Sequence, residues 1–100
     1  MDITVLIANR NYSRYITDCI QSAINQTLSP KCICIVDDGS TDNSWDIIKA
    51  YAEENQKEEN VAKSEIGDIL IKVGNIRGID IVGVKLPKPT GPSQARNIGI

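Results

Sequence analysis

The sequence of 100 residues allows one small domain at most. Its composition, with 41% hydrophobic and 24% charged residues, is ordinary for a globular chain. The net charge of −2 provides no basic surface of the kind that binds nucleic acid, so we expect no nucleic-acid partner.

Several classes of chemistry are excluded by what the sequence lacks. Histidine is absent, so this chain cannot supply a Ser-His-Asp or Cys-His catalytic group or a histidine metal ligand. No apolar run approaches the ~18 residues that a membrane span needs, and the first residues lack the pattern of a signal peptide. Of the three cysteines, Cys32 and Cys34 share one face of a predicted strand and are interpreted as small core residues in a reducing compartment.

The chain begins with a predicted strand followed by a predicted helix. Residues 3–8 form a short apolar run, I-T-V-L-I-A, typical of a buried strand that ends at a polar turn. From Tyr12 to about Leu28 the apolar residues recur with the helical i, i+3, i+4 spacing, which predicts a helix with one face on a sheet. Asn11 or Ser13 is expected to cap this helix, and Pro30 to close it.

A second strand and helix follow directly. Residues 32–36 predict a buried strand, so Asp37 and Asp38 emerge at its carboxyl edge, where ligands bind in open α/β sheets. Gly39 permits a sharp turn with positive φ, and residues 40–43 offer several caps for a helix over about residues 42–54. The order β-α-β-α implies parallel strands with right-handed crossovers.

The rest of the chain is less regular. Residues 55–66 lack periodicity and predict a solvated loop, and two strand-like pieces within residues 68–86 predict a hairpin. After a proline-rich break, residues 93–100 look like the start of a helix with Ser93 as its cap. We therefore expect the chain to be the incomplete amino-terminal part of a longer domain.

Two loops at the same sheet edge form the candidate site. They are residues 8–12 after the first strand and residues 37–44 after the second. An aspartate there can accept a hydrogen bond from a ring N–H of a nucleobase, which uracil and guanine supply. A metal role for Asp37 and Asp38 is chemically possible, but adjacent side chains on an extended strand point to opposite faces. The favoured interpretation places one acid on a base or ribose and gives the other a structural role.

Arg96 is a further candidate. An arginine in the first turn of a helix is poorly placed for the helix dipole. A ligand phosphate or an acidic partner would explain its position, because its guanidinium makes bidentate contacts. The alternative is an ordinary surface arginine.

Taken together, these segments resemble a known family. The run I-V-D-D-G-S-T-D-N-S at residues 35–44, the first strand with its turn, N-Q-T at residues 25–27 and A-R-N-I-G-I at residues 95–100 resemble an inverting family 2 glycosyltransferase of the GT-A fold. The resemblance implies an α/β fold: the Rossmann-like, nucleotide-binding half of a three-layer α/β/α domain, here with an added hairpin. It covers residues 3 to about 54 and 93–100.

The resemblance also implies roles for particular residues. Asp37 would bind the uracil or other base of a nucleotide-sugar donor, and Asp38 would support the ribose or the turn. The base pocket would be lined by Ala8, Asn9 and Asn11. Arg96 would approach the nucleotide or the acids that bind the metal.

The catalytic parts of such an enzyme are expected outside this chain. In the family, a later Asp-x-Asp motif holds Mg²⁺ or Mn²⁺ on the diphosphate, and a still later acid acts as general base on the acceptor hydroxyl. Neither is present here, so no catalytic or metal-binding residue is assigned and the chain alone should be inactive. The expected partners are a UDP-sugar donor and a sugar, glycan or lipid-linked acceptor. The expected location is cytoplasmic, with the full-length protein able to associate with the inner face of the membrane.

The sequence departs from the family pattern at several points. Ala8 stands where proline is usual and Arg10 where an aromatic is common, so the pocket wall differs. Residues 90–92, T-G-P, replace the common Asn-x-Gly before the A-R-N motif. Two other functions stay open: a nucleotide-binding or scaffold domain without catalysis, and a receiver-like signalling module suggested by the acid pair and by Lys88-Pro89.

Overall fold

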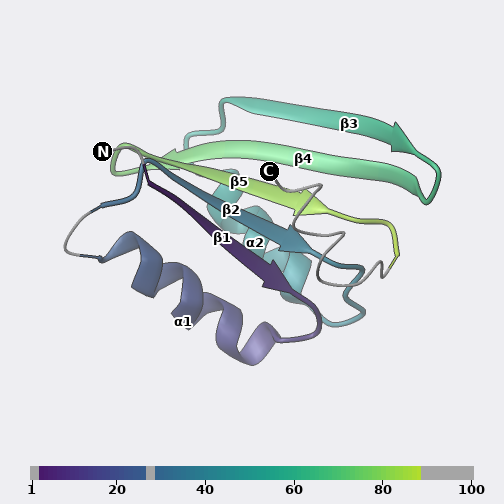
Figure 1. Cartoon of the computed structure of the whole chain (residues 1–100), viewed down its shortest axis with the longest axis horizontal. Helices are drawn as coiled ribbons and strands as arrows, with labels where there is room; N and C mark the ends of the chain where they lie inside the picture. The colour runs from purple at the N-terminus through teal and green to yellow at the C-terminus, as the bar shows by residue number, and fades with distance from the viewer. Residues whose placement is uncertain (1–2, 27–28, 89–100) are drawn as a thin grey trace.

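The computed structural model describes residues 3–26 and 29–88, which fold into a five-stranded sheet with two helices (Figure 1). In chain order the elements are β1 (Thr4–Asn9), α1 (Ser13–Ile24), β2 (Cys32–Asp37), α2 (Ser44–Ala52), β3 (Glu58–Ser64), β4 (Gly67–Ile76) and β5 (Ile79–Lys85). The strands lie side by side in the order β1-β2-β5-β4-β3. The predicted α/β class and its β-α-β-α start are confirmed. Neither helix in this part of the chain has the length and apolar character to cross a membrane.

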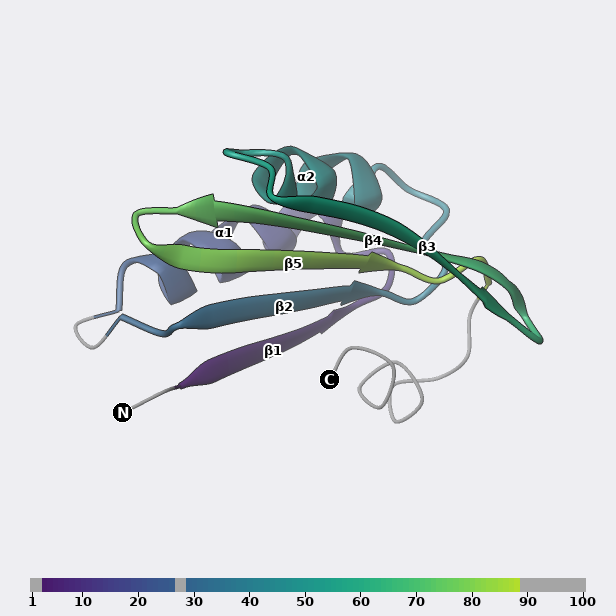
Figure 2. The ribbon, with the colours of Figure 1, turned by 90° about the horizontal axis from the view of Figure 1, so that it is seen from above.

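The sheet is mixed, and its parallel part fixes where the helices lie. Strands β1, β2 and β5 run parallel, whereas β5, β4 and β3 form an antiparallel meander. The connections from β1 to β2 and from β2 to β5 advance in the same direction across the sheet, so right-handed crossovers place α1 and α2 on the same face (Figure 2). The described residues therefore supply two of the three expected layers.

Alternation along the strands divides the apolar side chains between two clusters. The cluster beneath the helices has as its buried members Ile16, Ile20, Ala23, Ile24, Ile33, Ile35, Trp45, Ile48, Ala52, Ile79 and Ile81. The cluster on the opposite face has Cys34, Val36, Ile69, Val84 and Leu86. The sheet is thus apolar on both faces, as is usual for parallel strands, which are commonly covered on both sides.

The three thiols differ in their surroundings. Cys19 is exposed on α1, Cys32 is half-buried and Cys34 is buried in the cluster opposite the helices. Burial raises the pKa of the Cys34 thiol to about 11, and burial followed by the charge of Asp80 raises that of Cys32. Neither thiol is in a disulfide, and the core role expected for both agrees with the burial of Cys34, whereas Cys32 is only half-buried.

The loop predicted for residues 55–66 is wrong over most of its length. Residues 58–64 form β3, which pairs antiparallel with β4. Every residue of β3 is exposed, so the strand has no buried face and no alternation of apolar and polar residues could reveal it. Its backbone pairing and the ion pair between Glu59 and Lys72 of β4 hold it in place. Its charged side chains suit the edge of a sheet, where they discourage pairing with another chain.

The predicted hairpin is formed by β4 and β5. Arg77 and Gly78 connect the strands, and both have positive φ, 55° and 83°, as a two-residue type I′ turn requires. The turn is confined to these two residues, because β4 continues to Ile76. Gly74 lies within the strand, and position 74 needs a glycine because the end of α2 passes close to it. A Cβ there would lie 2.3 Å from the carbonyl oxygen of Ala52.

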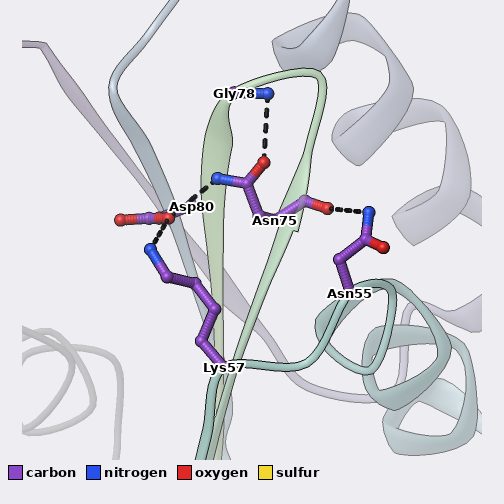
Figure 3. Close-up of polar contacts among 5 residues, drawn as sticks. All are labelled: Asn55, Lys57, Asn75, Gly78 and Asp80. Atoms are coloured by element: carbon purple, nitrogen blue, oxygen red, sulfur yellow. Dashed lines mark hydrogen bonds and ion pairs between the residues drawn. The ribbon is translucent and has the colours of Figure 1, made fainter.

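A polar cluster at the turn end of this hairpin attaches it to the segment after α2 (Figure 3). Asp80 Oδ1 accepts hydrogen bonds from Asn75 Nδ2 and Lys57 Nζ, both at 3.0 Å. Asn75 also accepts from the Gly78 N–H at 3.1 Å, and its carbonyl oxygen accepts from Asn55 Nδ2 at 3.1 Å. The hydrogen bonds from Asn75 and Lys57 lower the pKa of the Asp80 carboxyl.

We predict that Gly74→Ala destabilises the fold. The new Cβ would meet the backbone oxygens of Ala52 and Glu54 at 2.3 and 2.6 Å, so the end of α2 must move, at a cost of about 1–3 kcal/mol in the free energy of unfolding. Urea denaturation measures the loss. Gly83→Ala is the matched control, because its nearest contacts would be side-chain atoms of Ile48, Ala52 and Trp45, at 3.1, 3.2 and 3.5 Å, and not backbone. Equal losses in the two variants would contradict the explanation.

We also predict a pH dependence that arises from Asp80. Its pKa is lower in the folded chain than the ordinary 3.8, so the unfolded state binds the proton more readily. The stabilisation is complete above pH 3.8 and is lost as the pH falls through the folded pKa. Asp80→Asn should therefore lose less stability than the parent between pH 6 and pH 2, as measured by urea midpoints. An unchanged pH profile in Asp80→Asn would refute this role.

Candidate functional site

The candidate site consists of two loops that meet at the carboxyl ends of β1 and β2. Register places Asn9, the last residue of β1, directly beside Asp37, the last residue of β2. The loops that follow, residues 10–12 and 38–43, each lead into the first turn of a helix. The sequence predicted this meeting, and the structure confirms it.

Asp37 is the centre of the contacts between these loops. Its side chain is fully buried. Oδ1 accepts hydrogen bonds from Asn9 Nδ2 at 3.0 Å and from Ser40 Oγ, and Oδ2 accepts from the Ser40 N–H at 3.3 Å. A carboxylate removed from water needs such donors, because a buried oxygen without a donor is costly. The neighbouring turn is thus built around Asp37.

Asn11, in the loop after β1, connects that loop to the loop after β2 by hydrogen bonds. Its φ of 57° is in the left-handed region, which asparagine tolerates better than most residues. Its Oδ1 accepts from the N–H groups of Thr41 and Asp42 at 2.8 and 3.3 Å. Its own N–H donates to Ser40 Oγ at 2.9 Å. The prediction that Asn11 or Ser13 caps α1 is therefore wrong.

The capping role belongs to Asp42, which comes from the other loop. Its Oδ2 accepts from the N–H of Ser13, the first residue of α1, at 3.1 Å, and its Oδ1 accepts from the N–H of Ser44, the first residue of α2, at 2.9 Å. The N-cap positions themselves, Tyr12 and Asn43, make no side-chain cap hydrogen bond. The hydrogen bonds from Ser44, and then those from Ser13, lower the pKa of the Asp42 carboxyl.

The remaining predicted residues are only partly placed. Asp38 is buried at the same edge, and its N–H donates to the Asn9 carbonyl oxygen at 2.8 Å. Gly39 has a φ of 68°, which confirms the expected sharp turn. Ala8 is exposed next to the buried Asn9. Arg96 and the predicted helix of residues 93–100 lie outside the described residues. Asn9, Asn11, Asp37 and Asp38 are thus brought together, and their ligand roles stay predictions.

In the part of the chain that the structure describes, the acids at this edge do not gather with other side chains into a metal-binding group. Within residues 3–26 and 29–88, no three histidine, cysteine, aspartate or glutamate side chains gather in a way that could hold an ion. The oxygens of Asp37 and Asp42 accept hydrogen bonds from protein N–H and O–H groups. The residues described here therefore do not fit a divalent cation by themselves.

Two residues of the site have roles that the sequence did not disclose. Ser40 donates to Asp37 and accepts from both Asn9 and Asn11, and Asp42 accepts from two helices. The sequence identified both only as possible caps for α2. The signal that could have found them is the density of short polar side chains in residues 37–44 beside a second polar loop.

The sequence as a whole matches the family model for glycosyl transferase family 2 over residues 4–100. An uncharacterized glycosyltransferase of Nostoc sp. is 52% identical over 54 residues, which are 54% of this chain and 17% of that protein. The chondroitin synthase of Escherichia coli is 41% identical over 49 residues, 49% of this chain and 7% of that protein. The hyaluronan synthase of Pasteurella multocida is 41% identical over 46 residues, 46% of this chain and 5% of that protein. The chain thus spans a small part of each relative. No solved structure matches it significantly.

We predict that Asn9 and Ser40 stabilise the site cooperatively. Asn9→Ala or Ser40→Ala should each cost about 1–3 kcal/mol in the free energy of unfolding, because each removes a donor from the buried Asp37. The two share Oδ1 of Asp37 and bond each other at 3.3 Å, so the double variant should differ from the sum of the single losses. Urea denaturation of the four proteins gives the coupling. Additive losses would mean that the two residues act independently.

Proposed function

The chain belongs to glycosyl transferase family 2, and on that premise we propose that it forms the donor-nucleotide half of an enzyme that transfers a sugar from a UDP-sugar to an acceptor hydroxyl with inversion. The observation that carries the proposal is the pair of polar loops bonded to each other at the carboxyl ends of parallel strands. This is the edge where open α/β sheets bind their ligands.

The proposed contacts follow from which groups are exposed and which are buried. Ala8 and Asn11 are exposed and would meet the base first. Asp37 and Asp38 lie deeper. Among the described residues, the Ser40 N–H donates to Oδ2 of Asp37 at 3.3 Å, and a carboxylate oxygen can accept a second hydrogen bond, from a ring N–H of the base. Because Asp37 is buried, that contact requires a loop side chain to move aside. Asp38 would support the ribose or the turn, and Arg96 would approach the phosphates.

The rest of the reaction is assigned to parts of the enzyme beyond this chain. A divalent cation, Mg²⁺ or Mn²⁺, would neutralise the departing diphosphate when bound, and its ligands and the general base are proposed outside these residues. A glycan acceptor is consistent with relatives named for chondroitin and hyaluronan synthesis, and a sugar or lipid-linked acceptor is the alternative. A cytoplasmic location, with or without association with the inner face of the membrane, remains part of the proposal.

A nucleotide-binding domain without catalysis is the second candidate. It is favoured by the use of the edge acids as hydrogen-bond acceptors for the protein's own groups. A receiver-like signalling module is disfavoured, because a complete strand and helix precede Asp37 and two antiparallel strands separate α2 from β5.

The proposal predicts a defined NMR titration. UDP should shift the backbone amides of residues 8–11, 37–40 and 96, and ATP at the same concentration should not. Asp37→Asn should weaken UDP binding about tenfold, because the amide replaces one of the two acceptor oxygens by an NH₂ donor, which cannot accept the base N–H. Adding Mn²⁺ should leave the affinity almost unchanged. Equal affinity in parent and Asp37→Asn would remove Asp37 from the site, and a large gain with Mn²⁺ would assign a metal to these acids.

A further inference from the structure

The two helices that flank the site share a single capping carboxylate. Asp42 Oδ2 accepts from Ser13 at the start of α1, and Asp42 Oδ1 accepts from Ser44 at the start of α2. The two serines are 31 positions apart in the sequence, on either side of β2. The amino ends of both helices therefore converge on one side chain.

Two helix amino ends that share one side chain need an ionised carboxylate there. Each helix begins with N–H groups that have no partner within the helix, and its amino end carries a partial positive charge. A carboxylate offers two equivalent acceptor oxygens, so one side chain can serve both helices at once. An asparagine at the same place would keep one acceptor and present an N–H₂ donor to the other helix. Asp42 and Asn are thus not interchangeable here.

A second set of bonds runs in the opposite direction between the same loops. Asn11 of the first loop accepts from the N–H groups of Thr41 and Asp42, while Asp42 of the second loop accepts from Ser13. The second loop thus supplies an acceptor to the start of α1, and the first loop supplies one to the backbone of the second. Displacing either loop would therefore break the hydrogen bonds accepted by Asn11 as well as the one that Asp42 accepts from Ser13.

We propose that Asp42 is a positioning residue that fixes the two walls of the site, residues 8–12 and 37–41, relative to each other. It caps α1 and α2 together and touches no substrate. Its consequence for ligand binding rests on the proposed function, whereas its coupling of the two loops does not. The side chain is exposed, so water can replace its bonds. Its loss should therefore disturb the geometry of the site more than the stability of the whole fold.

The test compares Asp42→Asn with Asp46→Asn. Asp46 lies in the first turn of α2 and is exposed, so the control makes the same change of charge at the same helix end. In Asp42→Asn the amide resonances of both Ser13 and Ser44 should move, and the affinity for UDP should fall about fivefold, the size of a lost helix cap. In Asp46→Asn the Ser13 resonance should stay in place and the UDP affinity should remain within about twofold.

A third variant separates positioning from stability. Asn75→Ala removes hydrogen bonds to Asp80 and Gly78 at the opposite end of the sheet, so it destabilises the fold without touching either loop. Its UDP affinity should equal that of the parent while it remains folded. An equal loss of affinity in Asn75→Ala and Asp42→Asn would overturn the positioning role.

The outcomes also separate this inference from the proposed function. If the parent does not bind UDP, the proposed function fails, and the Ser13 amide decides the inference alone. A Ser13 resonance that moves in Asp42→Asn and not in Asp46→Asn supports the coupling of the loops. A Ser13 resonance that stays in place overturns it, because Asp42 would then be a cap for α2 only.

Discussion

The need of the buried Asp37 carboxylate for hydrogen-bond donors organises this end of the molecule. A charged group that is fully buried at the end of β2 must find its partners within the protein, and it finds them in Asn9 and Ser40. Asn9 belongs to the neighbouring strand and Ser40 to the following turn, so satisfying one side chain fixes two loops. Asn11 and Asp42 then extend the same network to the first turns of both helices. The site is a consequence of burying an acid where two parallel strands end.

The other half of the sheet is organised by close backbone approach and by charge. Gly74 allows the end of α2 to lie against β4, which no larger residue would permit without movement. Lys72 is buried between Glu53 at the end of α2 and Glu59 of β3, and its hydrogen bonds to Glu59 and then to Glu53 raise its pKa. One lysine thereby connects three successive elements. This meander holds β5 against β2, and so supports the strand that carries Asp37.

The sequence predicted those features that leave a local signal. The run of residues 32–36 indicates a buried strand, and the helical spacing from Tyr12 indicates α1, although the helix ends at Ile24 rather than near Leu28. The wholly exposed β3 leaves no such signal, because its pairing with β4 depends on the backbone and not on side-chain alternation. The reciprocal bonds of Asn11 and Asp42 connect residues about 30 positions apart, and a local sequence pattern can mark such residues as hydrogen-bonding without identifying their partners. The position of Asp37 was predictable, but its network was not.

The unequal surroundings of the three thiols give the protein a built-in attachment point for a spectroscopic probe. At neutral pH the buried Cys34 and the half-buried Cys32 are disfavoured as thiolates, since both have raised pKa values, whereas Cys19 is exposed on α1. Alkylating reagents react with the thiolate, so a maleimide dye should modify the natural sequence at α1 selectively. Because α1 begins at the loop that carries Asn11, a fluorophore on this helix would sense rearrangement of that loop without any engineered cysteine.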